Sequence, residues 1–127
     1  MKASNFQFLN PYLEEMFFAG NDNFDMNEDI EMENSFNVQV KKDKENRRAK
    51  VELVLETNVN VEDAPFRMRV KVASDFKWDN LDDESVEAML KCNAPALLLS
   101  YMRPIVANIT NVSKFPVYNL PFVNFQE

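Results

Sequence analysis

Hydrophobic and polar residues alternate with period two through the middle of the chain. One apolar-rich set shares a face: Val51, Leu53, Leu55, Thr57, Val59 and Val61. After the turn-like stretch 62–65 the alternation resumes in a second set: Phe66, Met68, Val70, Val72, Phe76 and Trp78. Period two is typical of strands with one buried and one solvent-facing side, so these stretches predict a long antiparallel hairpin. Pairing Val61 with Phe66 would place Glu56 opposite Lys71 on the wet face.

Two further strands are predicted upstream of the hairpin. One contains the alternating apolar residues Phe36, Val38 and Val40, and a polar turn over 42–48 follows it. The first strand is less regular, because Phe6 and Phe8 alternate but Pro11 interrupts the phase. Proline cannot donate to a strand ladder, so Pro11 indicates an edge strand or a bulge. Gly20 is the only glycine, and we therefore expect asparagine at turn positions that need positive φ.

The periodicity becomes helical after Trp78. A negatively charged start at Asp82, Asp83 and Glu84 is favourable against the helix dipole and predicts a short helix to about Lys91.

A second, longer helix is predicted to start with Asn93 as N-cap and Pro95 in its first turn. Its apolar residues recur at helical spacing: Leu97, Leu98, Tyr101, Met102, Ile105, Val106 and Ile109. Pro104 removes the partner of the Ser100 carbonyl, which predicts a kink near 100–104. The residues after this helix contain two prolines among alternating apolar residues and are expected to be extended.

The order of elements predicts an α+β fold formed by a single domain over residues 1–127. We expect a four-stranded antiparallel sheet followed by a short helix and one long, kinked helix packed on one sheet face.

Composition excludes most chemistry. The net charge of −7 disfavours nucleic acid as a partner, and the absence of histidine excludes Ser-His-Asp and Cys-His arrangements. One glycine excludes phosphate-binding loops, and a lone Cys92 excludes the usual zinc sites. We therefore expect no enzyme activity, no metal and no cofactor. The single cysteine and the lack of a signal peptide or membrane-spanning run indicate a cytoplasmic protein.

Four segments, in order, carry a resemblance that covers nearly the whole chain. They are the opening Phe6-Gln7-Phe8 with Tyr12 and Met16-Phe17-Phe18; the alternating hairpin 50–78; Asn93-Ala94-Pro95-Ala96-Leu97-Leu98 with Tyr101 and Arg103; and Phe115-Pro116, Asn119-Leu120-Pro121 and Val123-Asn124-Phe125. Together these segments resemble the SecB family of export chaperones. The last two matches are the most specific.

The resemblance implies an ATP-independent holdase chaperone that binds non-native polypeptide clients in long apolar grooves and serves protein export. It also implies a homo-oligomer, most simply a tetramer built as a dimer of dimers. The residues in the matching segments that could line the groove are Phe17, Phe24, Met26, Leu98, Tyr101 and Met102. Phenylalanine and methionine suit a site for many clients because they adapt their packing, although each could equally serve the core or a subunit interface. Phe24 and Met26 are the better candidates because they interrupt a polar loop.

The sequence departs from the family pattern at two places. It ends two residues after Phe125, where the family continues into a second helix and a mobile tail that contacts the export motor SecA. The sheet surface that would face SecA includes Glu15, which fits the acidic pattern of the family, and Arg67 and Arg69, which do not. We therefore expect binding to SecA to be weak or absent.

Two alternatives remain open from the sequence. The chain could be a SecB-like chaperone dedicated to an antitoxin or to few clients, which a neighbouring toxin–antitoxin gene pair would favour. It could also be a carrier of a hydrophobic small molecule, which would retain a ligand of discrete mass in native mass spectrometry.

Overall fold

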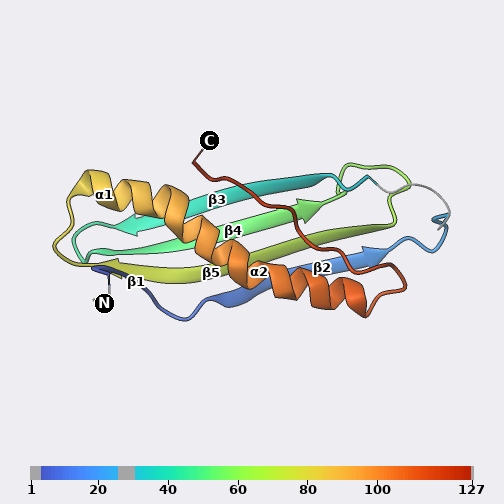
Figure 1. The fold of residues 1–127 in the computed structure, drawn as a ribbon, viewed down its shortest axis with the longest axis horizontal. Helices are drawn as coiled ribbons and strands as arrows, with labels where there is room; N and C mark the ends of the chain where they lie inside the picture. Colours follow the sequence, from blue (N-terminus) through green and yellow to red (C-terminus); the bar gives the residue numbers. More distant parts are fainter. Residues whose placement is uncertain (1–3, 26–30, 127) are drawn as a thin grey trace.

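Strands and one continuous helix form two layers, as the computed structural model of the chain shows (Figure 1). The structure describes residues 4–25 and 31–126. The strands are β1 (Phe6–Phe8), β2 (Tyr12–Gly20), β3 (Asn34–Asp43), β4 (Arg48–Thr57) and β5 (Phe66–Trp78). The helix comprises α1 (Asp83–Ala88), the π-helical turn η1 (Met89–Asn93) and α2 (Ala94–Asn111). It crosses one face of the sheet diagonally, which confirms the α+β prediction.

The sheet is antiparallel with the order β1-β5-β4-β3, and β2 also pairs with β5. β1 and β2 occupy different lengths of the same neighbour: Phe6 pairs with Trp78, whereas Gly20 pairs with Phe66. They are therefore two parts of one edge strand, interrupted near Pro11 as its chemistry predicts. Counted in this way the sheet has four strands, as predicted.

The register predicted for the β4–β5 hairpin is wrong. Glu56 lies opposite Arg69, and Lys71 lies opposite Val54. The predicted register assumed that β4 continued to Val61, but the strand ends at Thr57. The ladder is therefore shifted, although the same side chains face the core because the shift is by an even number of residues.

Asn58 is the reason that β4 ends early. Its backbone has φ of 60°, which turns the chain out of the strand. Its buried side chain links the two neighbouring strands: Nδ2 donates to the Phe66 carbonyl at the start of β5 at 3.1 Å, and Oδ1 accepts from the Glu33 amide just before β3 at 2.9 Å. Asparagine is a common turn residue, but the apolar alternation continues past Asn58 to Val61, so the pattern alone did not predict a turn here.

Positive φ occurs at two asparagines, Asn58 and Asn80, which confirms the expectation for a glycine-poor chain. The other two described cases are Arg47 and Asp63. Gly20 does not have positive φ; it lies close to the Phe115 ring instead, because a Cβ atom added there would lie 3.2 Å from Cε2 and the ring would have to move slightly.

The helix starts as predicted, but its interior differs. The Asp82 side chain accepts a hydrogen bond from the Ser85 amide at 2.7 Å, and this bond lowers the pKa of the Asp82 carboxyl. The predicted N-cap at Asn93 is wrong, since Asn93 has helical dihedral angles and makes no capping bond. Pro95 offers no N–H for a helical bond, and the π-helical turn η1 lies just before it. The result is one kinked helix of 29 residues rather than two helices.

The hydrophobic core lies between the helix and the sheet. Its fully buried members include Val51, Leu53, Leu55, Met68, Val70, Val72, Val86, Leu90, Leu98, Met102 and Val106. Full burial of each such side chain stabilises the fold by about 1.5–3 kcal/mol. After α2 the chain returns beside the helix, on the same side of the sheet, as an extended strap that we define as residues 115–126 (Figure 1).

Replacing Asn58 should destabilise the fold. We expect Asn58→Ala to lower the unfolding free energy by about 2 kcal/mol or more, because it removes hydrogen bonds to buried main-chain groups and strains a left-handed residue. Asn58→Gly should recover about 1 kcal/mol of that loss, since glycine accepts positive φ. Urea unfolding of the three proteins measures both effects. Unchanged stability of Asn58→Ala would contradict the role given to this side chain.

Candidate functional site

A groove runs between α2 and the strap. Its larger part is a cavity of about 510 Å³ lined by Ala96, Leu99, Ser100, Arg103, Phe122 and Val123. A smaller cavity of about 200 Å³ continues it and is lined by Cys92, Asn93, Ala96 and residues 122–126. The two share residues of both walls, so they form one groove that is open to solvent along the helix.

Side chains of the helix hold the strap. Arg103 donates through Nη1 to the Leu120 carbonyl at 2.5 Å and through Nη2 to the Pro121 carbonyl at 2.9 Å. Nearer the start of the helix, Sγ of Cys92 lies 3.7 Å from the Phe125 carbonyl. Within the described part of the chain, residues 116–126 make no main-chain hydrogen bond to the backbone of the helix or sheet. The strap is thus an extended segment bound mainly through its carbonyls and apolar side chains.

The groove leaves apolar surface open. Phe122 is 89% exposed at its wall, and Val123 is half-buried. A single exposed phenylalanine on a monomer needs no explanation, but an exposed one beside a groove with apolar walls is typical of a binding surface. The arrangement suits an extended peptide rather than a compact ligand, which needs an enclosed pocket.

The helix residues predicted for the groove separate into two groups. Leu98 and Met102 are completely buried on the side of α2 that faces the sheet. They belong to the hydrophobic core of the chain. Tyr101 is 42% exposed, and its ring edge packs against Phe8 with centroids 6.4 Å apart.

The other predicted groove residues also do not meet at one place. Phe17 is 52% exposed and pairs with Arg69, on the sheet face opposite the helix. Phe24 is half-buried on the helix side and packs edge-to-face with Phe115, with ring centroids 6.4 Å apart, so it does have core to pack against. Met26 lies outside the described residues.

Sequence reasoning missed the residues that form the groove walls. Leu99, Arg103 and Phe122 were not among the candidates, although they line the cavity. The available signal was Arg103, a cation within a largely apolar helix and near no acidic helix neighbour. Phe122 follows a proline in an extended segment, where period two would place it on the same side as Leu120. Leu120 is buried and Phe122 is exposed, so the alternation does not predict the exposure of Phe122.

A second apolar surface follows the β1–β2 edge of the sheet. Its exposed large side chains are Phe8, Leu9, Tyr12 and Leu13. In the described structure β2 pairs only with β5, so its other backbone edge is open. An open edge flanked by apolar side chains is a typical surface for pairing with another chain.

The outer sheet face carries a compact charge network centred on Glu52, whose side chain is 4% exposed. Its carboxylate lies close to three ammonium groups: Lys41 at 3.5 Å, Lys50 at 3.4 Å and Lys71 at 3.7 Å. Burial acts to raise the pKa of Glu52, but the three lysines together hold this pKa below its ordinary value. Glu52 is therefore a buried carboxylate that stays charged.

Arg69 is neutralised within the same face. Its Nε lies 2.6 Å from Glu15 and its Nη1 lies 3.2 Å from Glu56. The structure thus brings together Glu15 and Arg69 of the predicted motor-facing surface, but as an ion pair rather than as free charges. No ion pair of Arg67 occurs within residues 4–25 and 31–126.

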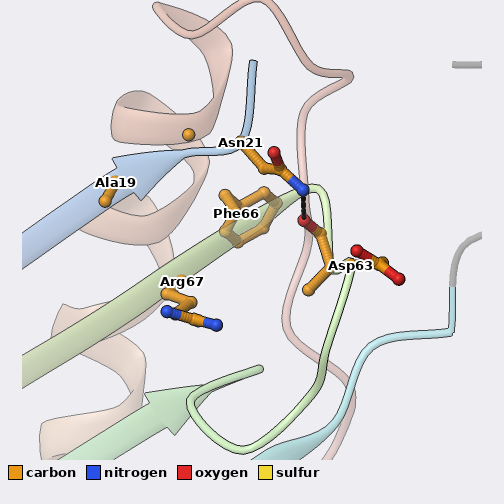
Figure 2. A pocket seen from close by; sticks show the side chains of 7 residues that line it. Ala19, Asn21, Asp63, Phe66 and Arg67 are labelled. Atoms are coloured by element: carbon orange, nitrogen blue, oxygen red, sulfur yellow. Dashed lines mark hydrogen bonds between the residues drawn. The ribbon is translucent and has the colours of Figure 1, made fainter. Parts of the chain in front are cut away.

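Arg67 lines a pocket of about 300 Å³ at the end of β2, and the other lining residues are Ala19, Gly20, Asn21, Asp63, Ala64 and Phe66 (Figure 2). The Asn21 side chain closes one wall by donating to the Ala64 carbonyl at 3.0 Å. The Asp63 carboxylate points away from Arg67 (Figure 2). Among the residues that the structure describes, no carboxylate pairs with this exposed guanidinium.

The described residues bring together no group of His, Cys, Asp and Glu side chains that could hold a metal ion. No described helix has the length and apolar character needed to cross a membrane.

Comparison with known proteins identifies the family. The sequence matches the SecB family, described as preprotein translocase subunit SecB, over residues 2–127. The protein-export protein SecB of Histophilus somni (strain 2336) is 34% identical over 64 residues, which cover 50% of this chain and 37% of that protein. SecB of Actinobacillus succinogenes is 37% identical over 75 residues, 54% of this chain and 45% of that protein. The matches therefore span less than half the length of these two relatives.

A solved structure shares the fold. It is the SecB-like chaperone of Mycobacterium tuberculosis in complex with a ChAD peptide from the HigA1 antitoxin. The similarity has a TM-score of 0.76 and covers 94% of this chain and 91% of the other, at 16% sequence identity.

Glu52 should make the fold acid-sensitive. Because its pKa is lower in the folded chain than in the unfolded chain, ionised Glu52 stabilises the fold above the unfolded pKa. That stability is lost as the pH falls through the folded pKa, so the unfolding free energy should drop as the pH falls below the ordinary glutamate pKa of 4.5. Glu52→Gln should lower stability at neutral pH and flatten this dependence. Urea unfolding across the pH range tests it, with the exposed Glu62→Gln as control; identical slopes in all three proteins would contradict it.

Proposed function

Because the chain belongs to the SecB family, we propose that it is a holdase chaperone, which binds non-native polypeptides in the groove beside α2 without nucleotide. The observation that carries the proposal is the strap itself. An extended apolar segment already lies against the helix, held through main-chain carbonyls by Arg103. A groove that binds a backbone in this way accepts many sequences. We further propose that the protein works in the cytoplasm, where Cys92 would stay reduced.

The shape of the groove favours a chaperone over a carrier. A small-molecule carrier surrounds its ligand, whereas the cavities beside α2 are open and share the exposed Phe122 as a wall. Walls that are apolar and carry few hydrogen-bonding groups bind through the apolar surface area that is buried, which requires no fixed pattern of hydrogen bonds. This property supports binding of unfolded segments and gives no support to catalysis.

We propose that the clients are preproteins on their way to export, as the family description indicates. The dedicated alternative, with an antitoxin as client, is supported by the fold that this chain shares with the mycobacterial SecB-like chaperone. Similarity of fold does not by itself transfer a client, so we retain the general form of the function.

We propose that binding to SecA is weak. Glu15 is engaged by Arg69 at 2.6 Å, so it offers less free negative charge to a cationic partner. Arg67 adds an unbalanced positive charge at the end of the same face. Like charges that lose water at an interface oppose association by several kcal/mol. Arg67 would face such repulsion from a cationic surface of SecA.

A charge on the helix wall of the groove should reduce holding activity without reducing stability. Ala96 is an exposed residue of α2 that lines both cavities. We expect Ala96→Glu to suppress client aggregation about fivefold less efficiently, because a carboxylate beside a bound apolar segment loses water without gaining a partner and weakens binding by about 1 kcal/mol. Light scattering of a denatured client diluted into buffer without nucleotide measures the effect. The control is Val112→Glu, which adds the same charge at a residue that is 77% exposed outside the groove. Equal activity of both variants and the unmodified protein would contradict the assignment of the groove, and a failure of the unmodified protein to hold clients would contradict the function.

The open β1–β2 edge should form a subunit interface. We propose a homo-oligomer, most simply a tetramer, and light scattering at micromolar concentration should give a mass near four times 14.8 kDa. Leu13→Lys should shift the mass downward, because it places a charge on the apolar edge. Val112→Lys adds the same charge elsewhere and should not. A mass of 14.8 kDa alone for the unmodified protein would refute the interface.

A further inference from the structure

The two halves of the strap are held differently. Residues 115–120 are anchored, because Phe115 and Leu120 are buried and the Tyr118 amide donates to Oγ1 of Thr110 at 2.9 Å. Residues 121–126 are held more loosely. Phe122 is exposed, and only Val123 and Phe125 are half-buried. The second half therefore contributes no fully buried side chain to the core, and its departure costs less than that of the first half.

Phe125 provides the main apolar contact of the second half. Its ring packs edge-on against Phe36 of β3, with centroids 6.4 Å apart. Among the described residues, the donor to the Phe125 carbonyl is the thiol of Cys92, which is a weak donor. These contacts stabilise the segment modestly, as expected for a part of the chain that opens locally.

Arg103 binds the strap in a way that does not depend on its sequence. Both of its bonds go to main-chain carbonyls of successive residues, Leu120 and Pro121. In the described structure no carboxylate forms an ion pair with Arg103. A planar guanidinium offers several donors in a fixed fork and can make the same bonds to any extended backbone.

From these contacts we propose that residues 121–126 are a resident occupant of the groove, that an extended apolar segment of a client displaces them, and that Arg103 then donates to a client carbonyl in place of the Pro121 carbonyl. The proposal rests on the holdase function proposed above. The client segment takes the place of a segment with the same chemistry, which is why the groove can accept it. Arg103 is thereby assigned as a main-chain binding residue.

Displacement sets a threshold for client binding. A tethered occupant competes at a high effective concentration, and the apparent affinity of a client falls with the fraction of molecules whose groove is open. Segments that offer several apolar side chains together with free carbonyls compete well. Folded proteins, whose backbones are already paired, do not.

Covalent pinning of the strap tests displacement. Gln126→Cys places a second thiol in the cavity that Cys92 also lines, so mild oxidation can link them, with mass spectrometry to verify the link. The probe is fluorescently labelled, reduced and carboxymethylated α-lactalbumin, a permanently unfolded client, with affinity measured by anisotropy. We expect the linked protein to bind at least about tenfold more weakly, and reductant to restore affinity in the same sample. Cys92→Ser combined with Gln126→Cys cannot form the link and serves as the control.

A second experiment separates client binding by Arg103 from simple anchoring of the strap. Phe125→Ser loosens the strap and should tighten client binding about threefold. In that background Arg103→Ala should weaken client binding about tenfold, and Arg103→Lys should weaken it less, because one ammonium can still donate to a carbonyl. If Arg103 only anchors the strap, Arg103→Ala will leave affinity unchanged or raise it once the strap is loose.

The outcomes are distinct. Equal affinity of the linked and reduced proteins would overturn displacement while leaving the holdase function intact. Unchanged or increased affinity after Arg103→Ala in the loosened background would overturn the role of Arg103. Absence of client binding by the reduced protein would overturn the holdase function together with this inference.

Discussion

Burial of the apolar face of β4 and β5 beneath one continuous helix is the interaction on which the rest of the structure depends. Leu98 and Met102 point into this layer, and their burial fixes the rotation of α2. At that rotation, Arg103 and Leu99 lie beside the strap rather than over the sheet. The π-helical turn η1 keeps the helix continuous across Pro95, so a single element reaches from the Asp82 cap to the end of the groove. The groove is therefore a by-product of how the core is packed.

The opposite face of the sheet is organised by charge rather than by burial of apolar side chains. Glu52 is almost inaccessible, yet three lysines surround it, so its desolvation is offset by close positive charges. Arg69 lies between two carboxylates on the same face. Most of these charges satisfy one another. A partner that docks here would meet a nearly neutral surface with a local excess at Arg67, whereas the helix side offers open apolar area.

The sequence predicted the parts of the fold that follow from periodicity. Alternation identified β3, β4 and β5, and proline chemistry placed the break between β1 and β2. The hairpin register could not be obtained in this way, because the even spacing of apolar residues continues past Thr57 while the side chain of Asn58 ends the strand. The cap at Asn93 failed for a similar reason: a π-helical turn allows a helix to pass a proline, and sequence spacing contains no sign of it.

The candidate site was predicted less well than the fold. Helical periodicity shows which face of α2 is apolar, and that face is the one that packs on the sheet. Leu98 and Met102 were therefore natural candidates that proved to be core, while the flank that contacts the strap is mixed in character. Which flank a returning segment covers depends on tertiary contacts such as the pair formed by Arg103 with the Leu120 and Pro121 carbonyls. Only the structure supplies these contacts.

An open apolar groove poses a physical difficulty for any protein that binds unfolded chains. Exposed apolar area that is large enough to hold a client also promotes association between copies of the protein itself. The strap reduces that area in the resting chain, because Val123 and Phe125 are half-buried against the helix and β3. Tighter burial of the strap would close the groove to clients, and complete detachment would leave it unprotected. The strap is bound by hydrogen bonds from Arg103 to its carbonyls and by apolar side chains that are only partly buried. Binding of this intermediate strength covers the groove at rest and still allows a competing backbone to enter it.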